Sequence, residues 1–355
     1  MISIIIPTLN EKKTIIPTIK EIKKNIQGVK HEVIVVDDDS PDKTWEVVQK
    51  TSLKNVKCIR RKDGSSLSSA VMVGFDNAKY ETLMVMDADG QHDPKIIKDM
   101  LKEIKKNDFV TGSRFIKGGG VVGWSKKRVF MSKTAALMAK PILSTKVKDP
   151  MSGFFMTKKK IYKEIKSKLS GKGYKIFLEM IFELEQKKGR AKVAEVPYHF
   201  RTRKQGESKL GIQVIKAYLL MLISFAIKKY AQLIKFLIVG STGVVVNTSI
   251  LWILTEKTGL FYVLSGVIAT QTAIINNFLL NNFWTWKRRD KKHSFIRRMV
   301  TFNIVSLAGL VITVFTLWTL TEAGIYYIIS NLIGIVLATT WNFIANDKIT
   351  FKGIK

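Results

Sequence analysis

Acidic residues follow three of the short apolar runs in the N-terminal half of this 355-residue chain. Glu11 comes after the first run, Asp37-Asp38-Asp39 after the second, and Asp87-Ala88-Asp89 after a later one. Carboxylates can lie beside a bound diphosphate only if a hard divalent cation stands between the negative charges. The pattern therefore predicts a site for a divalent cation and a phosphorylated ligand.

Other kinds of site are not supported by the sequence. It contains neither GxGxxG nor GxxxxGK[ST], so neither a dinucleotide fold nor a P-loop is expected. The four histidines, His31, His92, His199 and His293, are too scattered for a zinc site. No Ser-His-Asp arrangement is recognisable, so covalent catalysis is not expected. Cys58 is the single cysteine, which excludes an intramolecular disulfide and fits a reducing compartment.

Apolar strands that alternate with helical stretches must position the acidic residues. The expected strands are Ile2–Ile6, Val33–Val36, Val56–Ile59 and Leu83–Met86, and the expected helices lie around 12–26, 42–51 and 67–78. This alternation predicts an α/β domain with a mostly parallel sheet and helices on both of its faces. Ligands of such sheets bind beyond the carboxyl ends of the strands, where the acidic residues fall.

Four long stretches without a charged residue fill the C-terminal part of the chain: Phe236–Thr255, Thr258–Trp286, Met299–Thr321 and Ala323–Asn346. About 20 apolar residues cross a bilayer as a helix, so each stretch is long enough. Four in succession argue strongly against a soluble C-terminal part. We expect an all-α domain over 231–355, with transmembrane helices at about 233–255, 260–284, 300–321 and 325–346.

Basic residues indicate how these helices are oriented. The connection between the second and third spans, Trp286–Met299, carries seven Lys and Arg residues, whereas the other two connections are short and contain few charges. The positive-inside rule therefore places both termini and this loop in the cytoplasm, and the protein in the cell membrane. The net charge of +31 also fits nucleic-acid binding, but the spans favour the lipid bilayer and phosphorylated substrates, so no nucleic acid polymer is expected.

The membrane half repeats itself. Asn277-Phe278, Asn281, Thr285, Trp286 and Lys287 correspond to Asn342-Phe343, Asn346, Thr350, Phe351 and Lys352, and Gly243 corresponds to Gly309. The domain is thus expected to be a duplicated helical hairpin, and it resembles the GtrA-like four-helix membrane domain. We expect its intramembrane asparagines, Asn247, Asn276, Asn277 and Asn342, to make interhelical hydrogen bonds rather than a polar pathway.

A further apolar stretch, Ile212–Ile227, precedes the spans and has Gln213 and Lys216 on one side. It is short for a span, so we expect an interfacial amphipathic helix over 211–230 that lies against the bilayer. The catalytic domain is then expected to cover 1–210.

Motifs that occur in order along residues 1–215 resemble known families. Ile4–Glu11, Val35–Ser40 and Asp87–Asp89 look like glycosyltransferase family 2, which implies the GT-A fold. Further motifs resemble its dolichyl-phosphate mannose synthases: Gly112–Phe115, Gly118–Val121, Gly123-Trp124, Arg128, Ser132, Asp149–Phe154, Gly173-Tyr174, Glu179, Glu195–Pro197 and Arg203–Leu210. The appended membrane domain resembles archaeal members of that family.

The resemblance implies a donor site at the strand ends. The residues that it would bring to the nucleotide sugar are Pro7, Leu9, Glu11, Val36, Asp38, Asp87, Ala88, Asp89, Gln91, Arg203 and Lys209. Asp89 and Gln91 would also bind Mg²⁺ or Mn²⁺ beside the diphosphate. Leu9 stands where the family often has Tyr, and Asp39 where many members have Gly, which leaves the stacking of the base open.

The acceptor site is implied in the same way. Arg114, Arg128 and Ser132 would grip the phosphate of the acceptor lipid, because Arg offers bidentate geometry to phosphate oxygens. Ser208 and Lys209, in a loop with Arg203, would close over the donor phosphates or help to position the acceptor. Asp149 would either cap the segment after it or orient the sugar or the acceptor.

The chemistry of the implied reaction suits these groups. A polyprenyl phosphate is already an anionic nucleophile, so no general base is needed, and the enzyme must hold two negatively charged substrates together. The implied function is metal-dependent transfer of mannose from GDP-mannose to dolichyl (polyprenyl) phosphate, with inversion at the anomeric carbon. Two alternatives stay open: transfer of another sugar, such as glucose from UDP-glucose, and transport of a lipid-linked sugar. The oligomeric state is also left open.

Overall fold

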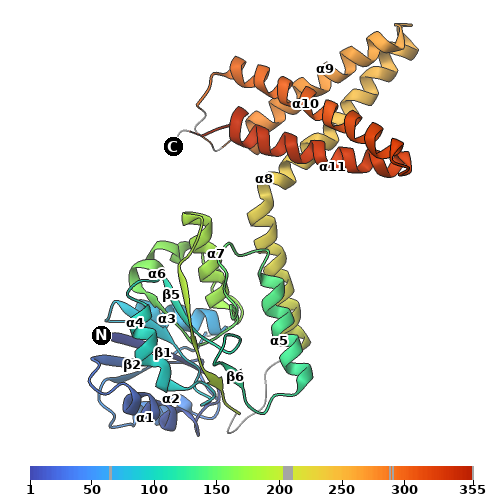
Figure 1. The fold of residues 1–355 in the computed structure, drawn as a ribbon. Helices are drawn as coiled ribbons and strands as arrows, with labels where there is room; N and C mark the ends of the chain where they lie inside the picture. Colours follow the sequence, from blue (N-terminus) through green and yellow to red (C-terminus); the bar gives the residue numbers. More distant parts are fainter. Residues whose placement is uncertain (64–65, 203–210, 288, 290–291, 354–355) are drawn as a thin grey trace. The chain divides into compact units, whose positions relative to one another are not determined.

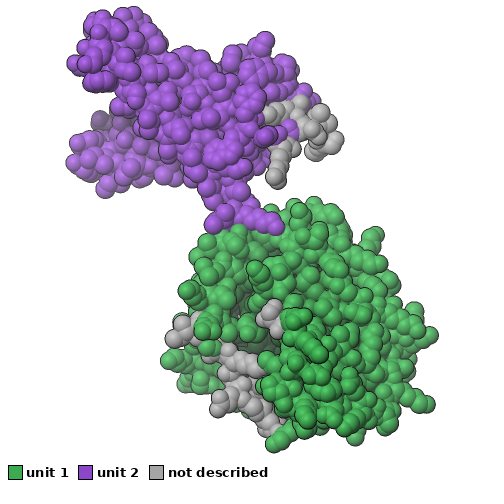
Figure 2. Space-filling view, turned by 180° about the vertical axis from the view of Figure 1, so that it is seen from behind, with its two compact units in different colours: residues 1–226 green, residues 227–355 purple. Residues whose placement is uncertain are grey.

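The computed structural model describes residues 1–63, 66–202, 211–287, 289 and 292–353. The chain divides into two compact units, Met1–Ala226 and Ile227–Lys355, which Figure 2 shows in different colours. Each unit has hydrophobic clusters of its own.

The described part of the first unit contains a seven-stranded sheet of order β3-β2-β1-β4-β7-β5-β8 (Figure 1). Its strands are β1 (Ile2–Thr8), β2 (His31–Asp37), β3 (Val56–Arg60), β4 (Thr82–Val85), β5 (Phe109–Ser113), β7 (Phe155–Lys158) and β8 (Val193–Pro197). All neighbours pair in parallel except β7, which is antiparallel to both β4 and β5. Two short strands, β6 (Gly120–Val121) and β9 (His199–Phe200), form a separate parallel pair. The prediction of a mostly parallel α/β sheet is confirmed.

Alternate residues of the central strands enter two different hydrophobic clusters. Ile4 and Ile6 pack on one side of the sheet and Ile5 on the other, because successive strand residues point to opposite faces. The first side is covered by α1 (Ile15–Asn25), α2 (Thr44–Gln49), the 3₁₀ turn η1 (Pro94–Ile96) and α4 (Ile97–Glu103). The second side is covered by α3 (Leu67–Asp76), α6 (Lys159–Ile165), which continues into the 3₁₀ turn η2 (Lys166–Lys168), and α7 (Ile176–Lys188). Strands buried on both faces explain the continuous apolar runs in the sequence.

The strand order changes direction between β1 and β4. The chain proceeds from β1 through β2 to β3, and β4 then lies on the opposite side of β1. The carbonyl of Ile5 accepts a bond of 3.1 Å from the N–H of Met86, so Ile5 and Pro7 face β4. The last pair between β1 and β4 is Ile5 with Val85, so Pro7 lies beyond the ladder and its missing N–H breaks no bond. In such sheets, this switch point is where a ligand crevice forms.

Two helices that lie side by side complete the first unit, α5 (Lys126–Ala139) and the start of α8 (Ile212–Trp252). The Tyr218 hydroxyl donates a bond of 2.6 Å to the carbonyl of Ala135. The Phe225 ring stacks on Phe182 of α7 at a centroid distance of 4.2 Å. One face of α8 therefore belongs to the catalytic core, whereas Ile223 on its other face is 55% exposed.

The helix expected over 211–230 is thus the first part of a longer one. α8 runs without a break from Ile212 to Trp252, and its residues up to Ala226 fall in the first unit. No Gly or Pro occurs between Ile212 and Gly240, so the sequence contains no stop signal at residue 230.

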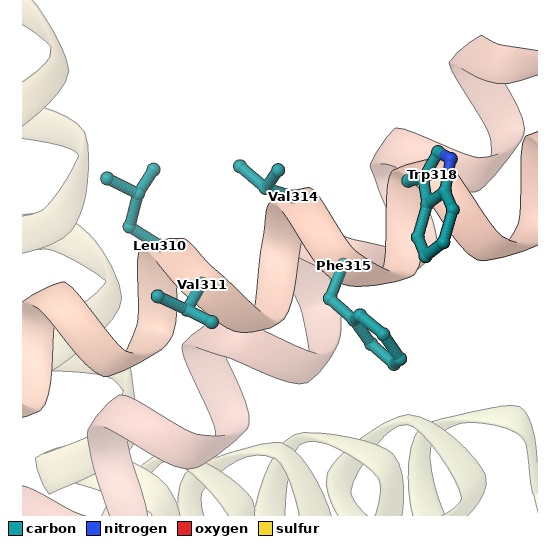
Figure 3. A pocket seen from close by; sticks show the side chains of 5 residues that line it. All are labelled: Leu310, Val311, Val314, Phe315 and Trp318. Carbon is teal, nitrogen blue, oxygen red and sulfur yellow. The ribbon is translucent and has the colours of Figure 1, made fainter.

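The second unit is helical over the residues that the structure describes. It contains the remainder of α8, α9 (Tyr262–Leu280), α10 (Phe295–Glu322) and α11 (Tyr327–Ala345), with π-helical turns η3 (Ile253–Lys257), η4 (Asn281–Thr285) and η5 (Asn346–Thr350). Among the described residues, four helices are long and apolar enough to cross a membrane. They are Gln213–Lys257, which includes the start of α8, Tyr262–Thr285, Phe295–Glu322 and Tyr327–Thr350. The side chains of Leu310, Val311, Val314, Phe315 and Trp318 extend from one stretch of α10 (Figure 3), and all are more than half exposed. Such a surface suits contact with lipid, and the chain is a multi-pass membrane protein.

The duplication seen in the sequence also has a structural counterpart. A Cβ atom added to Gly243 would overlap with the side chain of Asn277, and one added to Gly309 would overlap with that of Asn342. The π-helical turns η4 and η5, which follow these two asparagines, also occupy equivalent positions in the two copies. The sequence repeat therefore corresponds to a repeated contact between helices, in which a glycine packs against an asparagine.

Candidate active site

Hydrogen bonds join the ends of β1 and β2. The buried Asp37 carboxylate accepts hydrogen bonds from the hydroxyls of Thr8 (2.8 Å) and Ser40 (2.7 Å), so its role is to stabilise the fold. The Ser40 hydroxyl accepts a bond of 3.0 Å from the N–H of Asn10, a residue in the left-handed region at φ 61°. The segment after β1 is thereby fixed beside the loop after β2.

The residues expected to contact the base and ribose lie at this junction. Pro7 and Val36 are buried within β1 and β2, so their side chains belong to the core. Leu9 is 39% exposed, and the N–H of Glu11 donates a bond of 2.9 Å to the Thr44 hydroxyl. The Asp38 carboxylate accepts from the Nε of Arg61 at 2.7 Å, a partner that the sequence did not indicate.

Asp87 is held by a chain of buried aromatic groups after β4. The Nε2 of His92 donates to the Asp87 carboxylate at 3.0 Å, and the Tyr198 hydroxyl lies 3.3 Å from its Nδ1. An ionised carboxylate only accepts, so the Nε2 that faces Asp87 carries a proton. His92 is 2% exposed, and a Cβ added to Gly153 would lie 3.0 Å from an Asp87 oxygen. The Asp87 side chain itself remains 35% exposed.

Asp89 and Gln91 lie in the turn that follows Asp87. The Asp89 carboxylate accepts a bond of 3.0 Å from the N–H of Gln91. The Gln91 amide nitrogen donates to the carbonyl of Arg201 at 2.9 Å, which leaves the amide oxygen as the atom available to a cation. Ala88 is buried, and its carbonyl accepts from Thr18. Carboxylate and amide oxygens are ligands that Mg²⁺ and Mn²⁺ accept, so the donor set fits the predicted metal.

Arg114 and Asp149 form a buried bidentate ion pair. The Nε and Nη2 atoms of Arg114 each donate to the Asp149 carboxylate at 2.7 Å, and the side chains are 8% and 0% exposed. Burial alone would lower the pKa of Arg114, but the hydrogen bonds and charge of Asp149 outweigh burial and raise it. The separation of 35 positions along the chain explains why the sequence did not show this pair.

A cavity of about 590 Å³ lies beside this ion pair. Much of its wall is apolar and comes from α5 and α8, including Phe130, Met131, Met138, Ile215 and Leu219. Arg114, Arg128, Ser132 and Lys175 also line it. The cavity therefore combines cationic and hydroxyl groups with an apolar wall, which suits an anionic head attached to a hydrocarbon chain.

The structure brings all three residues predicted for the lipid phosphate to this cavity. Arg128 and Ser132 lie one turn apart on α5, and the Arg128 guanidinium lies 4.2 Å from the centre of the Trp124 ring. Arg114 differs from the expectation, because Asp149 occupies two of its three guanidinium nitrogens. Arg203, Ser208 and Lys209 lie outside the described residues.

Lys175 is a cavity residue that the sequence analysis did not single out. It follows the Gly173-Tyr174 motif and occupies the N-cap position of α7 without a side-chain capping bond. Burial is the main cause that lowers its pKa, and Arg114 lowers it further, while Asp87 and Asp149 act in the opposite direction. Lys175 and Arg114 line the same cavity, and the carboxylates of Asp87 and Asp149 are near enough to act on the pKa of Lys175.

Comparisons with known proteins identify the families that the two units resemble. Residues 3–166 match the model of the family described as Glycosyl transferase family 2, and residues 235–351 match that of the GtrA/DPMS transmembrane domain. Among solved structures, glucosyl-3-phosphoglycerate synthase from Mycobacterium tuberculosis is 18% identical, with a TM-score of 0.49 over 64% of this chain and 79% of that one.

Two curated relatives carry the same name. The dolichol-phosphate mannosyltransferase of Saccharomyces cerevisiae is 36% identical over 236 residues, which cover 64% of this chain and 88% of that protein. The dolichol-phosphate mannosyltransferase of Pyrococcus furiosus is 38% identical over 359 residues, which cover 99% of both proteins. Similarity at this level over both units shows that the chain belongs to the dolichol-phosphate mannosyltransferase family and is an enzyme, a glycosyltransferase of family 2.

Proposed function

We propose that the enzyme transfers mannose from GDP-mannose to dolichyl or another polyprenyl phosphate, giving dolichyl phosphate mannose and GDP. The observation that carries the proposal is the cavity in which Arg128, Ser132 and Lys175 share the lining with an apolar wall. The names of the two relatives support mannose and dolichyl phosphate as substrates. The carboxylates that follow β2 and β4 support the binding of a nucleotide-sugar donor at the ends of these strands.

The proposed reaction is a single displacement. An oxygen of the lipid phosphate attacks the anomeric carbon of mannose while the bond from that carbon to the β-phosphate oxygen breaks. The electron pair of the broken bond remains on GDP, and the configuration at the anomeric carbon inverts. Since the attacking phosphate is already ionised, no protein base has to remove a proton. The residues of the chain must bind two anions and align them.

Divalent metal dependence is part of the proposal. Asp89 and Gln91 would hold Mg²⁺ or Mn²⁺, and the bound ion would neutralise charge on the leaving diphosphate. Asp87, held by His92, would support the nucleotide beside them. Asp38, Glu11 and the segment from Pro7 to Leu9 would contact the base and ribose.

The acceptor phosphate would be bound by Arg128 and Ser132 on α5, with Arg114 contributing its remaining nitrogen. The cavity would also take the first isoprene units along Met131, Ile215 and Leu219. By the positive-inside rule, the catalytic unit and both termini would lie in the cytoplasm. The residues of α8 that are exposed on the catalytic unit would contact the bilayer interface.

Transfer assays in proteoliposomes test the proposal. GDP-mannose and UDP-glucose are each offered with dolichyl phosphate, with and without Mn²⁺ or Mg²⁺. We expect mannose transfer only, and only with metal. Transfer of glucose would mean that UDP-glucose and not GDP-mannose is the donor. Movement of a preformed lipid-linked sugar across the membrane, without any sugar transfer, would favour a transporter.

Asp89→Ala tests the metal ligand in the same assay. We expect turnover to fall by at least about 100-fold, since the leaving group loses its counter-charge, while the thermal midpoint changes little. Asp99→Ala is the matched control, because Asp99 is an exposed acid on α4 whose partner is Lys102. Near-normal turnover of Asp89→Ala would contradict the metal assignment.

A further inference from the structure

Lys175 lines two cavities of the first unit. It lines the cavity of about 590 Å³ and also a second cavity of about 270 Å³, and both are further lined by Val214 and Tyr218 of α8. Its ammonium group makes no hydrogen bond or ion pair with any residue in the described part of the chain. A partly buried ammonium that makes no hydrogen bond or ion pair among the described residues is costly, so such a group calls for an explanation.

The backbone before Lys175 is fixed by other parts of the chain. The Gly171 carbonyl accepts a bond of 2.6 Å from the Ser66 hydroxyl, and the Gly173 carbonyl accepts one of 3.1 Å from the N–H of Ser68. Gly171 and Gly173 have φ values of 65° and 77°, which glycine adopts without strain. The fixed loop therefore positions Lys175 beside the cavity.

The charges of the cavity indicate which ligand Lys175 would meet. Arg114 is neutralised by Asp149, and Arg128 and Lys175 are the other cationic residues in the described lining. A phosphate monoester carries close to two negative charges at neutral pH, because its second pKa is about 6. Cationic side chains in the lining favour such a dianion as the ligand.

We propose that the Lys175 ammonium binds the phosphate of the polyprenyl phosphate acceptor opposite Arg128, and that it makes the cavity select a phosphate over a neutral prenyl alcohol. The inference rests on the acceptor assigned in the proposed function. Arg114 lines the same cavity and Asp87 is near enough to act on the pKa of Lys175, so a phosphate bound there would lie towards the donor residues. Lys175 thus brings the nucleophile towards the anomeric carbon.

Direct binding tests this role without any sugar transfer. The full-length protein in detergent is titrated calorimetrically with a short prenyl phosphate, with the corresponding prenyl alcohol, and separately with GDP and Mn²⁺. Lys175→Met should weaken the prenyl phosphate by roughly 10- to 100-fold, the usual range for a charged hydrogen bond. Lys175→Arg should restore most of that affinity, and affinity for GDP should stay within about twofold of the wild type.

Lys168→Met is the matched control, since Lys168 is an exposed lysine in η2 and carries the same charge. An equal loss of prenyl phosphate affinity in both variants, or loss of GDP affinity in Lys175→Met, would overturn the proposal. Prenyl alcohol that binds as well as the phosphate would overturn it too. If the wild type binds the phosphate but transfers no mannose, the proposed donor fails while the role of Lys175 stands.

Discussion

At the scale of single residues, the site contrasts charges that the fold neutralises with one that it does not. Arg114 is neutralised by Asp149, whereas Lys175 has no ion pair within the described residues. A buried pair of opposite charges tolerates the interior, but a single charge is stabilised only when a ligand supplies its partner. The Arg114–Asp149 pair therefore stabilises the fold of the site, whereas Lys175 is the proposed ligand-binding residue.

The state of Lys175 without ligand gives a prediction about pH. Burial first, and then Arg114, lower its pKa, while the carboxylates of Asp87 and Asp149 raise it, with a net decrease. As the pH rises through this lowered pKa, the ammonium loses its proton and the cavity loses a positive charge. We therefore expect affinity for prenyl phosphate to fall on the alkaline side at a lower pH than an ordinary lysine would allow.

Comparison with Lys175→Arg isolates this effect. A guanidinium stays protonated over the whole range, so the alkaline loss of affinity should move to higher pH in the variant. Titrations with prenyl phosphate between pH 7 and 10 measure the shift. The second ionisation of the phosphate affects only the acidic side. Identical alkaline profiles for the two proteins would show that another group titrates there.

At the scale of elements, the strand ends were the part of the site that the sequence could predict. Asp38, Asp87 and Asp89 follow apolar runs, and parallel strands bring their carboxyl ends to one edge. That local rule does not apply to contacts between distant segments. The Arg114–Asp149 pair and the position of Lys175 depend on how loops cross the edge of the sheet. The hydrophobic periodicity of the sequence does not predict such crossings.

The boundary of α8 shows a second limit of local patterns. The helix was expected over 211–230 because the apolar stretch Ile212–Ile227 is short for a span, yet charged residues on one side of a helix do not stop it. Within α8, no Gly or Pro occurs before Gly240, and the helix continues through Gly240 and Gly243 to Trp252. The spans themselves were predictable, because their apolar length alone identifies them.

The packing of the membrane helices yields a prediction at the same scale. Gly243→Val should destabilise the second unit by about 1–3 kcal/mol, the usual cost of overpacking, because the new side chain would overlap with Asn277. Gly240→Val, one turn earlier on α8, is the control, since a Cβ there meets nothing within 4 Å. Thermal midpoints in detergent compare the two. Gly309→Val should behave like Gly243→Val, and equal midpoints for all three would contradict the repeated contact.

At the scale of the whole molecule, α8 contributes to both compact units. Its residues up to Ala226 belong to the catalytic unit, where Tyr218, Leu222 and Phe225 join the hydrophobic core. The rest of α8 belongs to the membrane unit. A chain cut within the first part would lose core packing and one wall of the acceptor cavity, whereas a chain cut just beyond it would retain both.

This difference determines where a soluble form should end. Truncation after Lys229 keeps every described residue of the proposed donor and acceptor sites, so we expect the shortened protein to bind GDP with Mn²⁺ as the full chain does. Its turnover of long dolichyl phosphate in liposomes should fall by at least about tenfold, because tethering raises the effective concentration of enzyme at the membrane. A short, water-soluble prenyl phosphate can diffuse to the site, so its turnover should change little.

Both acceptors are measured with both proteins, and the ratio of the two losses is the informative quantity. A loss confined to the long acceptor means that the membrane unit acts as an anchor. Equal losses on both acceptors, with GDP affinity intact, would mean that the membrane unit shapes the acceptor site itself. A shorter truncation after Gly211 provides the internal comparison. Since Tyr218 and Leu219 line the cavity, it should lose turnover even of the short acceptor.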